Sequence, residues 1–187
     1  VRLESLTSSQ LKDYPMTLGG EIIPTLPEML ALVDGRVPIL IELKTICGWR
    51  NNDLAKAVLR DLKNYPYKDV IALQSFDPFA VRWCRRHQTE YPFGQLASAE
   101  GEKGKTPKVL NDFMGKLHVN AISKPMFTSY DVVSSPNKYI DATHEKMPVL
   151  SWTVRTEENL AVAKKYADNV IFEKISPDII KKELPFK

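Results

Sequence analysis

The chain has 187 residues, of which 43% are hydrophobic and 26% are charged, proportions that are typical of a globular protein. Its formal net charge of +3 is small and its basic residues are scattered, so we expect no nucleic-acid partner. No apolar run reaches the roughly 18 residues of a membrane span, so we expect no transmembrane segment. The length suits a single domain over residues 1–187 with a sizeable core.

The first part of the chain predicts an irregular connection followed by a helix. Residues 1–23 contain turn-forming residues and show little periodicity. Thr25 and Glu28 then have the spacing of a capping box, in which the two side chains bind each other's backbone N–H groups. An apolar stripe follows, so a helix should begin directly after Thr25.

Six short apolar runs come next, and each precedes a stretch with helical periodicity. They are 37–44 (VPILIELK), 70–76 (VIALQSF), 93–97 (FGQLA), 119–124 (VNAISK), 148–154 (PVLSWTV) and 169–173 (NVIFE). Four of the helices have recognisable N-caps: Asp53, Asp77 before Pro78, Thr156, and Ser176 before Pro177. Strands that alternate with helices indicate a parallel sheet with right-handed crossovers.

Polar and amphipathic side chains gather where several of these predicted strands end. They are Glu42, Lys44, Gln74, Ser75, Lys124, Trp152, Thr153 and Glu173. Barrel enzymes build their sites at this end of the strands. No glycine-rich turn follows the first strand, so the fingerprint of a dinucleotide-binding open sheet is missing. We therefore predict an α/β fold of the (β/α)8 TIM-barrel class.

Glu42 and Lys44 give the strongest indication of function. They are two residues apart on a predicted strand, so their side chains share one face at a separation of about 6–7 Å. At this spacing, a cation bound to the carboxylate and the ammonium group itself can hold one phosphate from two sides. One carboxylate cannot hold Ca²⁺ or Mg²⁺ alone, since these ions take several oxygen ligands.

Four runs occur in a fixed order: IIPTLPEMLALV, VPILIELK, LQSFDPFAVRW and VLSWTVRTEENL. In order and spacing they resemble the glycerophosphodiester phosphodiesterase family, from about Leu6 onward. The resemblance implies a phosphodiesterase-type barrel that hydrolyses glycerophosphodiesters, which are small molecules, to glycerol 3-phosphate and an alcohol. It implies a divalent metal cofactor, Ca²⁺ or Mg²⁺, with Glu42 as a metal ligand and Lys44 as the phosphate-binding catalytic residue. It also implies that Phe76 and Trp152 contact the substrate.

The sequence departs from this family at its start. The family's H-R-G, E-x-D and H-D segments, which supply both acid–base histidines and two of three protein metal ligands, do not occur. We therefore expect the first two strand–helix units of the barrel to be absent from this chain. The length agrees, because a typical barrel has about 250 residues and two units have about 60. Without those histidines, the isolated chain should show no measurable diesterase activity.

The same residues are consistent with three other interpretations. Glu42 and Lys44 fit a structural ion pair, and Lys44 fits the nucleophile of a Schiff-base lyase. A non-catalytic relative of the barrel enzymes that binds phosphoesters or a partner is the third. The histidines do not decide among these: His87 falls on an apolar helical face and is expected to be packed, while His118 and His144 are expected at the surface.

Overall fold

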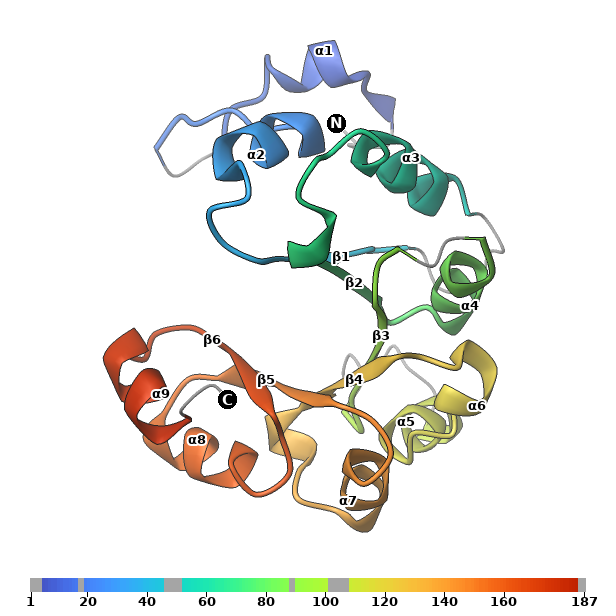
Figure 1. Cartoon of the computed structure of the whole chain (residues 1–187), viewed down its shortest axis with the longest axis vertical. Coiled ribbons are helices and arrows are strands. Elements are labelled where there is room, and N and C mark those ends of the chain that lie inside the picture. Colours follow the sequence, from blue (N-terminus) through green and yellow to red (C-terminus); the bar gives the residue numbers. More distant parts are fainter. Residues whose placement is uncertain (1–4, 17–18, 46–51, 88–89, 101–107, 185–187) are drawn as a thin grey trace.

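A computed structural model describes residues 5–16, 19–45, 52–87, 90–100 and 108–184. Six parallel strands form one sheet whose spatial order follows the chain (Figure 1). The strands are β1 (Ile39–Glu42), β2 (Ile71–Ser75), β3 (Phe93–Ala97), β4 (Phe127–Asp131), β5 (Val149–Val154) and β6 (Asn169–Phe172). All five neighbouring pairs are parallel, as the alternation of strands and helices predicted.

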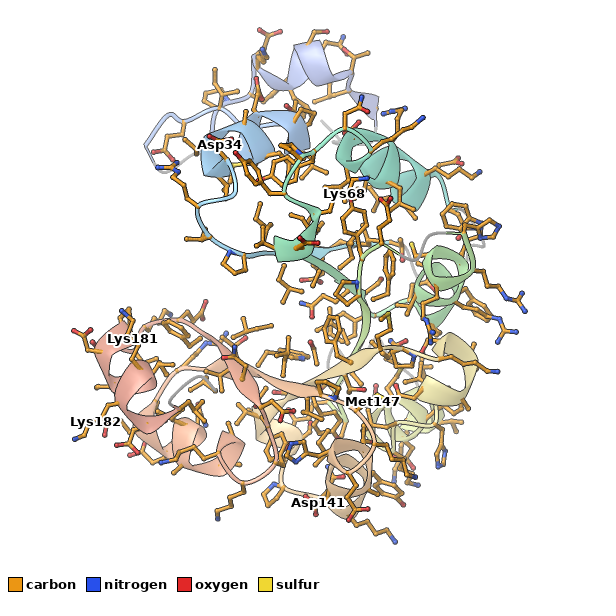
Figure 2. The ribbon with its side chains drawn as sticks, in the orientation of Figure 1. Asp34, Lys68, Asp141, Met147, Lys181 and Lys182 are labelled. Carbon is orange, nitrogen blue, oxygen red and sulfur yellow. The ribbon has the colours of Figure 1, made fainter. Side chains whose placement is uncertain are left out.

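Helices connect the strands and lie on the outer, convex side of the curved sheet (Figure 1). They are α1 (Ser8–Leu11), α2 (Leu26–Val33), α3 (Asp53–Leu62), α4 (Pro78–His87), α5 (Lys108–Gly115), α6 (Asn120–Ser123), α7 (Lys138–His144), α8 (Glu157–Ala163) and α9 (Pro177–Glu183), with the 3-10 turns η2 (Lys68–Val70) and η3 (Val132–Ser134). Their solvent-facing side chains, such as Lys181 and Lys182 on α9, point away from the sheet (Figure 2). None of the helices in the described ranges is long and apolar enough to cross a membrane.

The hydrophobic core lies between these helices and the outer face of the sheet. Leu62 of α3, Leu73 of β2 and Cys84 of α4 are completely buried in one cluster. A second cluster joins Ile140 of α7 and Val149 of β5. The apolar residues that give the strands their sequence signature therefore serve mainly to hold the helices.

The sheet curls strongly, because residues on non-neighbouring strands meet across its inner face. Phe76 follows β2 and Trp152 lies on β5, and β3 and β4 separate these two strands. In a flat sheet three strand spacings would place them about 14 Å apart. Their ring centroids are 5.6 Å apart. The sheet is therefore a section of a barrel wall.

The section is open between its first and last strands. Among the described residues, β1 pairs only with β2, and β6 pairs only with β5. An open cavity of about 770 Å³ lies between them, with lining residues that include Leu40 and Glu42 of β1 and Asn169 and Ile171 of β6. The structure thus has a six-stranded partial barrel in place of a complete (β/α)8 barrel.

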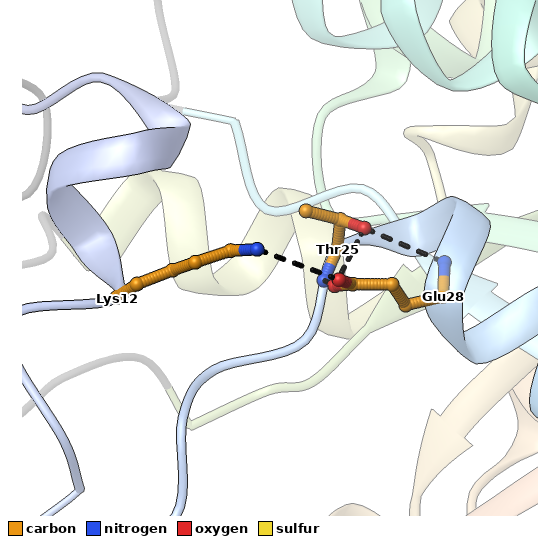
Figure 3. A network of polar contacts seen from close by, with 3 residues as sticks. All are labelled: Lys12, Thr25 and Glu28. Atoms are coloured by element: carbon orange, nitrogen blue, oxygen red, sulfur yellow. Dashed lines mark hydrogen bonds and ion pairs between the residues drawn. The ribbon is translucent and has the colours of Figure 1, made fainter.

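The predicted capping box is confirmed at the start of α2. The Thr25 backbone N–H donates to Glu28 Oε2 at 2.7 Å, and the Glu28 N–H donates to Thr25 Oγ1 at 3.4 Å (Figure 3). Lys12 Nζ lies 4.0 Å from the other carboxylate oxygen and ties the α1 segment to α2. The hydrogen bonds from Thr25 lower the pKa of Glu28.

One predicted strand is wrong. Residues 119–124 do not form the fourth strand: α6 occupies Asn120–Ser123, and Lys124 follows it with a left-handed φ of 50°. Val119 and Ser123 are both completely buried, and this spacing of four is helical. The fourth strand is β4, so Lys124 does not end a strand.

The other predicted boundaries are close to the observed ones. The caps Asp77, Thr156 and Ser176 are confirmed, because their side-chain oxygens accept hydrogen bonds from backbone N–H groups of the first helical turn. Asp53 is not a cap, because it is the first residue of α3 and Asn52 precedes it as the N-cap.

Candidate active site

Glu42 and Gln74 lie side by side on the inner face of the sheet. They are register partners on β1 and β2, and both line the cavity between β1 and β6. Glu42 is exposed to solvent, whereas Gln74 is buried. The carboxylate that the sequence singled out therefore opens into the cavity of the partial barrel.

Lys44 lies just beyond β1, not within it, and its two neighbours fix its backbone. The Leu43 N–H donates to Gln74 O at 2.8 Å, and Leu43 O accepts from Ser75 Oγ at 2.7 Å. Thr45 Oγ1 donates to Asp77 Oδ2 at 3.0 Å. The ammonium group is thus carried by a segment that is anchored to the β2–α4 junction.

No ion pair joins Glu42 to Lys44 within the part of the chain that the structure describes, and both side chains are exposed. The structural ion-pair interpretation is therefore not supported. Both charged side chains are instead open to solvent at the end of β1.

Phe76 and Trp152 form an aromatic wall at the same end of the strands. Their rings meet edge to face at an interplanar angle of 88°. Phe76 remains 40% exposed, and the Trp152 indole N–H is sealed from solvent with no hydrogen-bond partner among the described residues. The wall offers an apolar surface to the carbon atoms of a ligand.

Asp131 is a further carboxylate at this end of the sheet that the sequence reasoning missed. It ends β4 and is the register partner of Trp152. Its Oδ2 accepts from Ser98 Oγ at 2.9 Å and Ser134 Oγ at 3.3 Å, and its Oδ1 accepts from the Val133 N–H. These bonds occupy both oxygens, so Asp131 connects the ends of β3 and β4. Locating β4 correctly would have revealed it, since it is the last residue of that strand.

The described histidines lie away from the strand ends. His144 contacts Asp168 at 3.2 Å, and His118 is exposed, as predicted for surface positions. His87 is exposed, against the prediction of a packed position, although its ring stacks on Trp83 at 4.4 Å. None of the three is placed to serve as acid or base beside Glu42.

The donor groups near Glu42 do not by themselves make up a divalent-cation site. No three His, Cys, Asp or Glu side chains converge anywhere in the described ranges. Glu42 supplies one carboxylate, and the side-chain oxygen of Gln74 accepts a hydrogen bond from Ser129 Oγ at 2.6 Å. Ca²⁺ and Mg²⁺ require more oxygen ligands than these residues provide.

Comparison with known proteins identifies the family. The model of the glycerophosphoryl diester phosphodiesterase family matches residues 2–177. The chain belongs to this family. It is accordingly a phosphoric diester hydrolase of the glycerophosphodiester phosphodiesterase class, in a family whose members generally depend on a divalent metal. No curated protein matches the chain.

Solved structures of glycerophosphodiester phosphodiesterases have the same fold. One from Parabacteroides distasonis has a TM-score of 0.71 at 19% identity, and the match covers 97% of this chain and 71% of that chain. One from Thermotoga maritima has a TM-score of 0.64 at 20% identity, with coverages of 93% and 69%. A phosphodiesterase from Oleispira antarctica in complex with the product sn-glycerol-3-phosphate has a TM-score of 0.64 at 20% identity, with coverages of 87% and 61%. The six strands thus correspond to part of a phosphodiesterase barrel, as the sequence predicted.

Proposed function

We propose that the inner face of the partial barrel binds the glycerophosphate part of a glycerophosphodiester, and that hydrolysis there yields glycerol 3-phosphate and an alcohol. The observation that carries the proposal is the placement of Glu42 and Lys44 at the end of β1 in a chain of this family, where both are exposed and neither forms an ion pair with another described residue. The Oleispira antarctica phosphodiesterase, which was solved with sn-glycerol-3-phosphate, supports the choice of ligand.

Lys44 supplies positive charge for the phosphate. Its ammonium group can donate up to three hydrogen bonds to phosphate oxygens. The anchored backbone on either side limits how far the phosphate-binding group can move, which lowers the entropy lost on binding. Lys44 therefore compensates charge on the equatorial oxygens as the phosphodiester bond breaks.

Glu42 supplies one ligand for a divalent cation, which we take to be Ca²⁺ or Mg²⁺. A bound cation would polarise a phosphoryl oxygen. The described residues supply only this one carboxylate, so the remaining ligands must come from groups outside this set. We expect an added cation to contact the Glu42 carboxylate, with the low affinity that a single carboxylate provides.

Phe76 and Trp152 contact the carbon atoms of the ligand. Their edge-to-face packing keeps the aromatic wall rigid, and Phe76 is the more exposed of the two. We expect the wall to contribute affinity through burial of apolar surface, with little effect on the charge of the phosphate.

A binding experiment tests this proposal without requiring turnover. Calorimetric titration of the 187-residue chain with sn-glycerol 3-phosphate in the presence of Ca²⁺ should show binding. Lys44→Met should weaken it by about tenfold or more, because a hydrogen bond to a charged group is lost. Lys181→Met, an exposed lysine on α9, is the matched control and should leave the affinity unchanged. Equal affinities for the wild type and Lys44→Met would refute the role of Lys44.

The same titration tests whether Glu42 contributes to a cation site. If it does, Glu42→Gln should abolish the dependence of phosphate binding on Ca²⁺. Binding that never depends on Ca²⁺ would contradict this role of Glu42. The Schiff-base lyase is the weaker alternative, because such a lysine is usually desolvated and Lys44 is exposed.

A further inference from the structure

Gln74 is a polar side chain buried in the inner wall of the partial barrel. It is only 5% exposed, yet it lines the cavity between β1 and β6. Burying an amide is unfavourable unless both its oxygen and its nitrogen find hydrogen-bond partners. An apolar residue would fill the same wall without this penalty, so the amide calls for an explanation.

Ser129 satisfies one end of the amide and fixes its orientation. Its Oγ donates to Gln74 Oε1 at 2.6 Å, and Ser129 is completely buried. The bond joins β2 to β4 across β3. Because the oxygen of the amide is held toward β4, the nitrogen is the end that remains for another partner.

The amide nitrogen of Gln74 has no partner among the described residues. It is also not sealed from solvent: the sealed, unpartnered side-chain atoms in the described ranges are Gln95 Oε1, Asn120 Oδ1 and Trp152 Nε1. Gln74 and Glu42 line the same cavity. The two N–H donors of Gln74 are therefore accessible from the space in front of Glu42.

Glu42 and Gln74 form a complementary pair. They are register partners, so their side chains leave adjacent strands about 4.8 Å apart on one face. The carboxylate only accepts hydrogen bonds, and the amide nitrogen only donates them. A hydroxyl group, which does both, is the ligand group that this pair matches.

We propose that Gln74 is a specificity-determining residue that recognises a hydroxyl of the glycerol moiety. Gln74 Nε2 donates a hydrogen bond to the hydroxyl oxygen, and the hydroxyl group donates a hydrogen bond to one oxygen of Glu42. This inference rests on the proposed glycerophosphate binding and adds the feature by which glycerol is distinguished from simple alkyl groups.

Gln95 is a matched control within the same sheet. Gln95 is completely buried, and because it follows Gly94, the register partner of Gln74, its side chain faces the other side of the sheet. Its Nε2 donates to the backbone oxygens of Ser75, Phe76 and Leu96 at 2.9–3.1 Å. Gln95 thus satisfies backbone carbonyl groups of the sheet. Replacing it should lower the stability of the fold without changing the preference between ligands.

The test compares sn-glycerol 3-phosphate with propyl phosphate, which has the same carbon chain and phosphate but no hydroxyl groups. Both are titrated calorimetrically into the wild-type chain, Gln74→Met, Ser129→Ala and Gln95→Met in the presence of Ca²⁺. The wild type should prefer sn-glycerol 3-phosphate by about tenfold, because a site with a hydroxyl-binding pair rejects an analogue that leaves it unpaired. Gln74→Met should lower this preference to about one while keeping the affinity for propyl phosphate.

Ser129→Ala should lower the preference partly, since the amide keeps its donors and loses its orientation. Gln95→Met should keep the wild-type preference even if its Tm falls. A Gln74→Met protein that is folded by circular dichroism and retains the preference overturns the inference and leaves the proposed function intact. If the wild type binds both phosphates equally, the inference also fails. If the wild type binds neither, the proposed function fails and this inference fails with it.

Discussion

Lys44 illustrates how a side chain outside a strand is held in place by its neighbours. Strand pairing ends at Glu42, yet Ser75 and Asp77 bind the backbone and side chain on either side of Lys44. Spacing in the sequence was enough to single out Lys44. The supporting roles of Ser75 and Asp77 depend on which strand lies next to β1, and that information is not contained in local spacing.

Cys84 provides a prediction at the same scale. Burial raises the pKa of its thiol from 9.0 to about 12. In a Cys47→Ser background, where Cys84 is the remaining cysteine of two, the native thiol should react with a disulfide reagent at pH 8 on the order of a thousandfold more slowly than in urea. The reason is that only the thiolate reacts.

The pH dependence of stability follows from the same shift. The unfolded thiol loses its proton near pH 9, whereas the folded thiol keeps it until about pH 12. The stability that comes from the neutral buried thiol is therefore present below pH 9 and is lost as the pH rises toward 12. Similar reaction rates in native buffer and in urea would contradict this account of Cys84.

At the scale of single elements, Gly94 on β3 is a position where no side chain fits. A Cβ at this residue would lie 2.2 Å from the Phe127 ring of the adjacent strand. We expect Gly94→Ala to lower the free energy of unfolding by about 1–3 kcal/mol, because the ring must move within a packed wall. Urea denaturation measures this change.

Phe127→Leu supplies the matched test for Gly94→Ala. Leucine is smaller than phenylalanine, so Gly94→Ala should lower the free energy of unfolding less in a Phe127→Leu background than in the wild type. Additive losses in the two variants would show that the close contact is not the cause. Gly115→Ala, which places a Cβ 2.6 Å from Ala99 Cβ, tests a similar approach outside the strands.

The strand order and most strand positions could be predicted, and the reason for the one failure is physical. The outer face of the sheet is covered by helices and is therefore apolar. At β1, β2 and β5 this produces a run of apolar residues that is clear in the sequence. β4 has the sequence FTSYD, in which Ser129 is satisfied by Gln74 and Tyr130 OH donates to Gly115 O at 2.7 Å. Its polar groups are buried through partners distant in sequence, so local hydrophobicity did not reveal the strand.

At the scale of the whole molecule, the strands differ in how many neighbours they have. Each inner strand pairs on two sides, whereas β1 and β6 pair on one side within the described part of the chain. We expect the amides of β1 and β6 to exchange with deuterium faster than those of β3 and β4, because local opening breaks fewer contacts at an edge. Hydrogen–deuterium exchange with mass spectrometry measures this order, and equal protection of all six strands would contradict it.

The placement of Glu42 and Phe172 on facing walls has a consequence for biosynthesis. Ribosomes release the chain from its amino end, so the wall that contains Glu42 emerges about 130 residues before the wall that contains Phe172. A nascent polypeptide that stops before β6 would have the charged pair but no opposite surface to enclose a metabolite. The ability to retain a ligand should therefore appear abruptly, once β6 has emerged and folded.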